Sequence, residues 1–580
     1  MTMRTDYCGR LSSDDIGRTV TVCGWVAKRR EHGEFLAFVD LRDRTGLIQC
    51  VVDHAHEIRS EYVLAVTGVV RPRPDDTINA DLATGEIEIG DASVEILSQS
   101  DPVPFQIDRA GEVDETLRMR HRYLDLRTQR MQTNLRRRAL VNGAIRRSME
   151  SQEFLEVETP MLIASTPEGA RDFVVPSRLH AGTFYALPQS PQLFKQLCMV
   201  GGIDRYYQIA RCMRDEDLRA DRQFEFSQLD MEMSFADGDD VREIVSVAIA
   251  DATEVVTGNR PGPIPSMTWL DAMDNYGSDK PDIRFGMQLT DLSEIFAHTD
   301  FNAFKAPSVK GIRLPGGGDT TRNRLDQLTD RAKGWGAKGL VWIKVGANGE
   351  VNSPVAKFMS ESEIAGVLKE LDAEEGDICF IVADKWRRTV HVLGLLRLEL
   401  GRPPVNEGGY NFLWVTDFPL FESINEDGSP VPAHHPFTMP HEEDISLLSA
   451  KNDDTEKLLE IRSQAYDLVL NGWELGSGSV RIHQRELQQQ IFELLGINEE
   501  EAQAKFGFLM NAFRYGAPPH AGFAFGIDRL TALLSGEENI REVIAFPKSQ
   551  SGADPLTEAP TEIDPGQLNE LGLRLLPPVA

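Results

Sequence analysis

Opposite charges are unusually concentrated in one short stretch of this sequence. Residues 211–235, RCMRDEDLRADRQFEFSQLDMEMSF, contain four arginines and seven carboxylates. Such density is typical of a solvated surface or a disordered tail, yet the stretch also carries phenylalanines, leucines and methionines. Guanidinium groups bind carboxylates and phosphates through paired hydrogen bonds. The residue types therefore fit a ligand with phosphates, a flat base and an ammonium group.

The spacing within this stretch predicts an antiparallel hairpin. From Phe226 onward, alternate residues fall on opposite faces of a strand. One face is apolar and consists of Leu229, Met231, Met233 and Phe235, whereas the other consists of Phe226, Gln228, Asp230 and Glu232. The preceding run, RYYQIARCMR, reads as the partner strand, and DEDLRADRQ reads as a polar loop between them. The polar face is interpreted as the floor of a ligand site, and a salt-bridged sheet surface is the alternative.

Bulk composition narrows the class of protein. The chain has 580 residues, 41% of them hydrophobic and 26% charged, so several globular domains are expected. It has no apolar run long enough to cross a membrane, and its first residues lack the apolar core of a signal peptide. Six scattered cysteines without a C-x-x-C pair are typical of a reducing cytoplasm. The net charge of −30 argues against a generally basic nucleic-acid binder, although local basic patches remain.

The chain divides into five segments. Residues 1–104 contain about five short β-rich runs, which predict a small barrel such as an OB-fold, with an ordinary β-barrel as the alternative. Residues 105–130 are expected to form a linker or hinge, and helix is predicted over 117–150 with an apolar spacing at Leu135, Ala139, Ile145 and Met149. The sequence pattern changes at residues 283–407, which read as a self-contained αβ segment. From residue 408 the earlier pattern returns. We therefore expect one α+β domain, 131–282 and 408–580, interrupted by an αβ insertion.

Five motifs, in order, resemble those of the class II aminoacyl-tRNA synthetases. RDEDLRADRQFEFSQLD resembles motif 2, GFAFGIDRLTALL resembles motif 3, and FLEVETP resembles the end of motif 1. TPEGARDF and QSPQLFKQ narrow the resemblance to the bacterial aspartyl-tRNA synthetases, and it covers nearly the whole chain. The resemblance implies an anticodon-binding OB-fold at 1–104, and a seven-stranded antiparallel sheet with flanking helices that carries motifs 1 and 2 in 131–282 and motif 3 in 408–580. It also implies a homodimer formed through motif 1.

The resemblance implies a two-step reaction. L-Aspartate and ATP form aspartyl-adenylate, and aspartate is then transferred to the 3′ end of tRNA(Asp), with Mg²⁺ accompanying ATP. Arg214 and Arg529 are the implied catalytic residues. The implied ATP-binding residues are Arg214, Asp215, Glu216, Gln223, Phe226, Glu474, Gly526, Ile527, Asp528 and Arg529. The implied aspartate-binding residues are Glu168, Ser190, Gln192, Lys195, Arg214, Asp230, His434, His435 and Arg481.

Several of these assignments also make physical sense. Lys195 and Arg481 would pair with the side-chain carboxylate of aspartate, because two cations in one small pocket are costly unless an anion fills it. Asp467 and Glu474 would bind Mg²⁺. They are seven residues apart, which is two turns if the segment is helical, and such a pair is by itself more typical of a solvated face. The adjacent histidines 434 and 435 would otherwise be a weak metal signal, since neighbours on a strand point apart.

The tRNA specificity is predicted from the barrel. The implied anticodon and discrimination residues are Arg30, His32, Phe38, Gln49 and Asp76. In the family, histidine at position 32 accompanies acceptance of both tRNA(Asp) and tRNA(Asn), whereas Asp76 does not fit that pattern. We give more weight to His32 and expect tRNA(Asn) to be charged as well, with a strict enzyme as the alternative.

The chain departs from the family pattern at three places. Phe224 replaces a usual proline in the motif 2 loop, HGEFLAFVD is one residue longer than usual, and Ser477 replaces a common glycine. The extra residue changes the spacing before Phe38, the implied stacking residue, whereas Ser477 is expected to be harmless. Two other functions remain as alternatives: an asparaginyl-tRNA synthetase, and a tRNA-binding paralogue without catalysis. The pair Lys195 and Arg481 argues against the first, and the intact motif arginines and carboxylates argue against the second.

Overall fold

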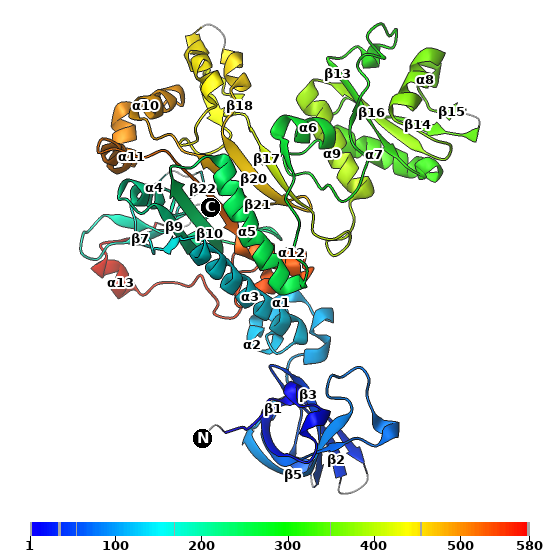
Figure 1. Cartoon of the computed structure of the whole chain (residues 1–580), viewed down its shortest axis with the longest axis vertical. Helices are drawn as coiled ribbons and strands as arrows, with labels where there is room; N and C mark the ends of the chain where they lie inside the picture. The colour runs from blue at the N-terminus through cyan, green and yellow to red at the C-terminus, as the bar shows by residue number, and fades with distance from the viewer. Residues whose placement is uncertain are drawn as a thin grey trace. The chain divides into compact units, whose positions relative to one another are not determined.

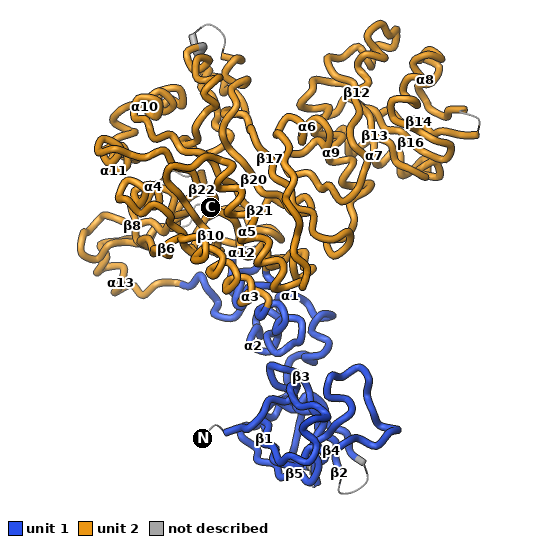
Figure 2. Tube along the Cα trace, viewed as in Figure 1, with its two compact units in different colours: residues 1–136, 541–561 blue, residues 137–540, 562–580 orange. Residues whose placement is uncertain are grey.

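A computed structural model describes residues 3–32, 36–53, 55–166, 169–347, 350–452 and 455–576. The chain forms two compact units, which are described separately below (Figure 2). The first comprises residues 1–136 and 541–561, and the second comprises 137–540 and 562–580. No helix in the described part of the chain is both long and apolar enough to cross a membrane.

The first unit contains a closed five-stranded barrel, as the sequence predicted for an OB-fold. Its strands follow the order β1-β2-β3-β5-β4. Side chains alternate along the strands: Ala37, Val39 and Leu41 are buried in the barrel core, whereas Phe38 and Asp40 lie on its outer side. The strands are β1 (Thr19–His32), β2 (Leu36–Asp43), β3 (Gly46–Asp53), β4 (Val63–Pro72) and β5 (Ile87–Ser98).

Short helices complete the first unit. Arg118 forms an ion pair of 2.9 Å with Glu542, and Arg122 donates a hydrogen bond of 2.8 Å to the Ile544 carbonyl, so the chain near 120 is tied to the segment that begins at 541. The helices are η1 (Cys8–Arg10), η2 (Ser13–Asp15), η3 (Ala55–Glu57), η4 (Asp75–Thr77), η5 (Ile107–Glu112), α1 (Glu115–Arg120), α2 (Arg122–Asp125) and η12 (Ile540–Val543).

The second unit is built on an eight-stranded sheet in the order β11-β17-β20-β21-β22-β10-β9-β6 (Figure 1). The six inner strands are antiparallel, as predicted, whereas the short edge strands β11 and β6 pair in parallel with β17 and β9. The expectation of seven strands was therefore one too low. The bounds are β6 (Leu155–Glu156), β9 (Arg205–Met213), β10 (Glu225–Ser234), β11 (Ser266–Thr268), β17 (Phe412–Thr416), β20 (Ala465–Leu470), β21 (Trp473–Val480) and β22 (His520–Gly526).

The predicted charged hairpin is β9–β10. Phe226 pairs with Cys212 and Asp230 pairs with Gln208, so the loop 214–224 lies between the strands. Leu229 and Met231 are fully buried, as predicted, but Phe235 is 77% exposed, because β10 ends at Ser234. The polar positions Asp230 and Glu232 are also buried, which is unusual for carboxylates.

Three helices cover the sheet and share its main core: α3 (Gln129–Ser151), α5 (Gly238–Thr257) and α12 (Ile527–Ser535). The single helix predicted over 117–150 is three helices, α1, α2 and α3. Ile145 and Met149 are fully buried as the spacing indicated, but Ala139 is exposed and Leu135 is only half-buried.

Further elements surround the sheet of the second unit. They are the hairpins β7 (Val174–Pro176)–β8 (Phe184–Ala186) and β18 (Phe421–Ile424)–β19 (Pro430–Pro432), and the helices α4 (Gln192–Val200), η10 (Glu442–Asn452), η11 (Thr455–Glu460), α10 (Arg485–Leu494), α11 (Glu499–Phe513) and α13 (Pro565–Glu570).

A five-stranded antiparallel sheet, in the order β12-β13-β16-β14-β15, lies between the two parts of the chain that form the eight-stranded sheet. Phe380 and Ile381 are successive residues of β16 and belong to two different hydrophobic clusters, so both faces of this sheet are covered. The strands are β12 (Thr290–Asp291), β13 (Ser308–Leu314), β14 (Val341–Val345), β15 (Val351–Asn352) and β16 (Ile378–Asp384). The helices are α6 (Trp269–Tyr276), η6 (Asn302–Phe304), η7 (Gly317–Asp319), α7 (Arg322–Gly334), η9 (Ala356–Phe358), α8 (Glu361–Glu370) and α9 (Trp386–Gly401).

Candidate active site

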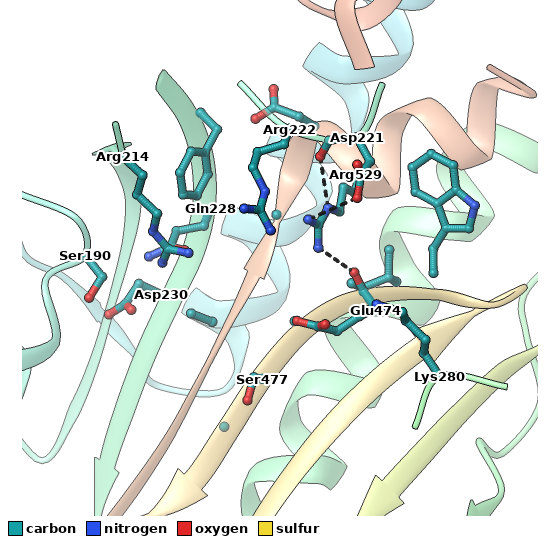
Figure 3. Close-up of a pocket in the computed structure, with 18 of the residues that line it drawn as sticks. Ser190, Arg214, Asp221, Arg222, Gln228, Asp230, Lys280, Glu474, Ser477 and Arg529 are labelled. Atoms are coloured by element: carbon teal, nitrogen blue, oxygen red, sulfur yellow. Dashed lines mark hydrogen bonds and ion pairs between the residues drawn. The ribbon is translucent and has the colours of Figure 1, made fainter. Parts of the chain in front are cut away.

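A cavity of about 540 Å³ lies over strands β10, β21 and β22 (Figure 3). This volume is in the range of sites that bind small molecules and cofactors. Most of the site residues predicted from the sequence line it: Ser190, Gln192, Lys195, Arg214, Glu216, Gln223, Phe226, Asp230, His434, His435, Glu474, Arg481, Gly526, Asp528 and Arg529. Residues from widely separated parts of the chain are thus brought together as the motif pattern indicated.

One end of the cavity holds two buried cations and two buried carboxylates. Lys195 on α4 lies 3.0 Å from Asp230 and 3.2 Å from Glu232, both on β10. Arg481, which follows β21, lies 2.9 Å from the other oxygen of Glu232. All four side chains are at most 2% exposed. Each charge is therefore compensated within the protein, which buried ions require.

This arrangement corrects the prediction that an anionic substrate is needed to neutralise Lys195 and Arg481. Glu232 already bridges the two cations. Although burial opposes ionisation, Arg481 and Lys195 hold the pKa of Glu232 below its usual range. Burial, which Lys195 opposes only in part, raises the pKa of Asp230 to about 6. One oxygen of Asp230 is buried without a hydrogen-bond partner among the described residues, so it can accept a hydrogen bond from a ligand.

The adjacent histidines both line the cavity. They lie in a bend after β19, not on a strand, so the expectation that they point apart does not apply. Nε2 of His435 lies 2.6 Å from the Arg481 guanidinium and must accept, because a guanidinium only donates. Burial and Arg481 hold the pKa of His435 well below its usual value, so this ring is neutral. Nε2 of His434 lies 3.8 Å from Asp467.

Cations and an aromatic ring line the rest of the cavity. The Arg214 guanidinium lies 5.1 Å from the centre of the Phe226 ring, a cation–π contact across the neighbouring strands of the hairpin. Arg529 on α12 forms an ion pair of 3.3 Å with Asp221 and donates a hydrogen bond of 2.9 Å to the Glu474 carbonyl (Figure 3). These groups offer donors to phosphates and a surface for a flat base.

The two predicted metal ligands lie on adjacent strands. Asp467 is on β20 and Glu474 is on β21, so the segment is not helical and their spacing does not correspond to two helical turns. Glu474 lines the cavity, and one oxygen of Asp467 is buried without a hydrogen-bond partner among the described residues. Burial raises the pKa of Glu474, and the Asp467 carboxylate raises it further. Two carboxylates with hard oxygen atoms on adjacent strands fit Mg²⁺, which commonly takes one or two carboxylates together with phosphates.

Three predicted residues have other positions. Asp215 does not line the cavity and pairs with Arg171 at 2.6 Å. Ile527 is fully buried in the main core. Asp467 does not line the cavity, although Ser477, with which it pairs across β20 and β21, does. Glu168 lies outside the described residues.

Asp528 has a structural contact at the cavity wall. It accepts a hydrogen bond of 2.8 Å from the Ser227 backbone and pairs with Arg138. Phe224, where the family has proline, packs edge-to-face on Phe173 with ring centres 5.4 Å apart. The substituted side chain is therefore partly packed.

The structure adds cavity residues that the sequence analysis did not assign. Gln228 was placed on the polar face of the hairpin but received no role, and Ser477 was noted only as a departure. The others include Asp221, Arg222, Lys280 and Arg402. Lys280 and Arg402 lie close to the two ends of the 283–407 segment. Their place in the cavity could have been predicted only from the fact that both ends of that segment return to the eight-stranded sheet.

The predicted anticodon residues lie on the barrel. Arg30 forms an ion pair of 2.8 Å with Asp40 and donates a hydrogen bond of 3.0 Å to Gln49, which is buried. Phe38 pairs with Arg30 across β1 and β2 and is partly exposed. Asp76 is exposed on η4. His32 ends β1, its side chain lies outside the described residues, and so does the insertion around 33–35.

Comparisons with known proteins identify the family. A family model described as "tRNA synthetases class II (D, K and N)" matches residues 114–550, and one described as "OB-fold nucleic acid binding domain" matches 20–97. The chain therefore belongs to the class II tRNA synthetases and is an aminoacyl-tRNA ligase.

Curated relatives match over almost the full length. The Aspartate--tRNA(Asp/Asn) ligase of Halothermothrix orenii is 50% identical, with 99% of this chain and 98% of that protein covered. The Aspartate--tRNA ligase of Bacillus licheniformis is 49% identical, with the same shares covered.

Solved structures share the fold. A putative aspartyl-tRNA synthetase from Leishmania major is 18% identical, with a TM-score of 0.57 and 94% of each chain covered. An asparaginyl-tRNA synthetase from Pyrococcus horikoshii, in complex with asparaginyl-adenylate, is 16% identical, with a TM-score of 0.55 and coverage of 94% of this chain and 98% of that chain. At these identities the likeness concerns the fold alone.

Proposed function

We propose that the cavity binds L-aspartate and ATP, forms aspartyl-adenylate, and transfers aspartate to the 3′ end of tRNA(Asp). The observation that carries this proposal is a buried network at one end of a cavity that is lined elsewhere by further arginines. The network consists of Lys195, Asp230, Glu232 and Arg481. A substrate with one ammonium and two carboxylates finds partners for every charge there. Asparagine has an NH₂ group in place of one carboxylate oxygen, and this group cannot accept a hydrogen bond from Lys195 or Arg481.

In the first step, an oxygen of the aspartate α-carboxylate attacks the α-phosphorus of ATP. The new bond is a mixed anhydride, and the bond to the β-phosphate bridging oxygen breaks, so pyrophosphate leaves with that electron pair. Arg214 holds both the carboxylate and the α-phosphate, and Phe226 stacks on the adenine. Asp230, with Ser190 and Gln192, receives the α-ammonium, while Lys195 and Arg481 bind the side-chain carboxylate. The rate comes from positioning and compensation of charge, without a protein nucleophile.

Asp467 and Glu474 are the residues that would hold Mg²⁺. A bound Mg²⁺ would compensate negative charge on the phosphates during pyrophosphate departure. Arg529 and Glu216 would bind the γ-phosphate and the adenine, with Gln223 and Gly526 beside them. These roles are assigned by family resemblance and are supported by the position of the side chains in one cavity.

In the second step, the 3′-hydroxyl of the terminal adenosine attacks the aspartyl carbonyl carbon and AMP leaves. Arg30, Phe38 and Gln49 on the barrel would contact the anticodon through polar groups and stacking. We place the reaction in the cytoplasm, where translation consumes aminoacyl-tRNA.

We also propose that the enzyme is a homodimer. Motif 1 and its surroundings expose an unusual number of apolar side chains, including Leu155 (57% exposed), Leu162 (53%) and Val174 (60%). Large apolar side chains that are exposed in a single chain are often buried in protein–protein interfaces. A second copy of the chain that covers this region would remove it from water.

The relatives named Aspartate--tRNA(Asp/Asn) ligase, together with His32, favour a second tRNA substrate. We propose that tRNA(Asn) is aspartylated as well.

Aspartate-dependent exchange of labelled pyrophosphate into ATP tests the first step. Exchange is expected with L-aspartate and less than about a hundredth as much with L-asparagine, a difference of about 2.7 kcal/mol. Equal exchange with both would contradict the assignment of Lys195 and Arg481 as the selective pair.

A further inference from the structure

The two chain crossings between the eight-stranded sheet and the 283–407 segment each bring a cation to the cavity. Lys280 lies on the outgoing crossing and Arg402 lies on the returning crossing, just after α9. Both residues line the part of the cavity near the start of β21. Gly472, Trp473 and Glu474 line the same part. Figure 3 shows Lys280 beside Glu474, on a different segment from Arg529.

Arg402 is fixed in place by the neighbouring turns. Its guanidinium lies 3.5 Å from Asp282 and donates a hydrogen bond of 3.1 Å to the Asn471 carbonyl in the β20–β21 turn. Asp282 is fully buried and also forms an ion pair of 2.6 Å with Arg284. The two crossings are therefore fastened to the turn that leads into Glu474.

Lys280 differs from Arg402 because its side chain is exposed to the cavity. Within the described part of the chain, its ammonium has no hydrogen bond and no ion pair, although its backbone N–H is bonded to Ser278. An exposed lysine beside a carboxylate in a ligand cavity is available for a ligand anion.

We propose that Lys280, supported by Arg402, binds the β- and γ-phosphates of ATP and the pyrophosphate that leaves. This inference deepens the proposed function and rests on it for the identity of the nucleotide substrate. It makes the crossings of the inserted segment part of the ATP site, alongside the motif 2 and motif 3 arginines.

The local charges support this role. The cavity end near Glu474 contains the Glu474 and Asp221 carboxylates, and Asp467 lies on the neighbouring strand β20. The Arg529 guanidinium is engaged by Asp221 and by the Glu474 carbonyl. These carboxylates repel a polyphosphate, and the cavity arginines Arg222 and Arg529 are each already paired with a carboxylate, so further cations at this end strengthen phosphate binding. Lys280 and Arg402 supply this positive charge from the two crossings of the inserted segment.

The test uses the full-length enzyme with Lys280→Ala, Lys280→Arg and a matched control, Lys305→Ala. Lys305 is an exposed lysine of the inserted segment that does not line the cavity. Calorimetry measures the Kd of Mg·ATP without amino acid, and pyrophosphate exchange measures the KM values of pyrophosphate and aspartate. For Lys280→Ala we expect about a tenfold rise in the Kd of Mg·ATP and the KM of pyrophosphate, about 1.4 kcal/mol, with the aspartate KM within twofold. Lys280→Arg should recover most of the loss, and Lys305→Ala should match the parent.

Two results would overturn the inference. Lys280→Ala could leave the Kd of Mg·ATP and the KM of pyrophosphate within twofold of the parent, or it could raise only the KM of tRNA in aminoacylation, which would assign the lysine to the acceptor end. The calorimetric measurement separates this inference from the proposed function. A parent that binds Mg·ATP through Lys280 but gives no aspartate-dependent exchange would refute the proposed substrate and leave the phosphate contact intact.

Discussion

At the scale of single residues, the aspartate end of the cavity is a balanced set of buried charges. Lys195 and Arg481 are compensated by Asp230 and Glu232, so these four groups together carry no net charge when both carboxyls are ionised. Aspartate adds one ammonium and two carboxylates, and Arg214 is available for the additional negative charge. Selectivity therefore depends on an exchange of partners, in which Lys195 and Asp230 turn from each other toward the substrate.

Replacement of Glu232 tests this balance. Glu232→Gln leaves Lys195 and Arg481 without their shared carboxylate, and loss of one partner from a buried ionic network costs about 3–5 kcal/mol. We expect the free energy of unfolding to fall by that order, and aspartate to restore part of it because its carboxylate supplies the missing charge. Denaturant unfolding with and without aspartate measures both effects. Glu225→Gln on the same strand, whose partner Arg211 is on the surface, should change stability by less than about 1 kcal/mol; equal losses in the two variants would contradict the account.

The raised pKa of Asp230 predicts a pH dependence of aspartate binding. Burial raises this pKa to about 6, so below that pH the carboxyl is protonated and no longer attracts the substrate ammonium. The KM of aspartate should therefore rise as pH falls through 6, while the KM of ATP changes little. Between about pH 4 and pH 6, the Asp230 carboxyl is protonated in the native state but ionised in the unfolded state. Its contribution to the free energy of unfolding therefore declines as pH rises through this range. Pyrophosphate exchange between pH 5 and 8 measures the first effect, and an aspartate KM that is flat across pH 6 would contradict the assignment of Asp230.

At the scale of elements, two hairpins set out the chemistry. The β9–β10 hairpin carries Arg214, Phe226 and Asp230, and the β20–β21 hairpin carries Asp467 and Glu474. The register shifts between Leu468 and Val469, so the two carboxylates are not directly opposite each other across the pair.

The carboxylates of the β20–β21 hairpin predict a dependence on Mg²⁺. Asp467→Asn and Glu474→Gln each remove a hard anionic ligand, so we expect the Mg²⁺ concentration for half-maximal pyrophosphate exchange to rise about tenfold or more. The loss should be greater for the pair than for either change alone. Glu422→Gln, an exposed carboxylate on β18 outside the cavity, is the control and should match the parent. Unchanged Mg²⁺ dependence in both variants would contradict the metal assignment.

The sequence predicted elements best where local patterns are strong. Alternation identified β10 and its buried Leu229 and Met231, and the short β-rich runs identified the barrel. Sequence-based prediction failed where long-range packing determines the contacts and the burial of a residue. Glu232 received no role, because only the fold brings Lys195 and Arg481 to its two oxygens. Ala139 was placed in an apolar spacing that the packing of α3 leaves exposed.

At the scale of the whole molecule, an acidic chain must recognise an acidic nucleic acid. The net charge is −30, so tRNA binding depends on local groups on the barrel and near the cavity, not on the average charge. The exposed apolar residues around motif 1 would be covered in the proposed dimer. The crossings of the inserted segment bring Lys280 and Arg402 to the cavity, where we infer that they bind the phosphates of ATP.

The specificity for tRNA is predicted at this scale. The anticodons for aspartate and asparagine differ at their last base, and one good polar contact to a base is worth about 1–3 kcal/mol by analogy with DNA readout. We expect tRNA(Asn) transcripts to be aspartylated at more than about a hundredth of the rate of tRNA(Asp) at equal salt, a gap below about 2.7 kcal/mol. His32→Leu should lower charging of tRNA(Asn) about tenfold and that of tRNA(Asp) little, whereas the barrel control His56→Leu should alter neither. If the parent charged tRNA(Asn) at less than about a hundredth of the rate of tRNA(Asp), the enzyme would be strict for tRNA(Asp).

The most direct test of the account is aminoacylation of a purified tRNA(Asp) transcript by the full-length chain with labelled amino acids, ATP and Mg²⁺. We predict that labelled aspartate becomes attached to the 3′ end, that asparagine does not, and that Arg214→Ala abolishes attachment while leaving binding of the transcript nearly intact. Attachment of asparagine in place of aspartate, or binding of tRNA without attachment of either amino acid, would contradict the central claim.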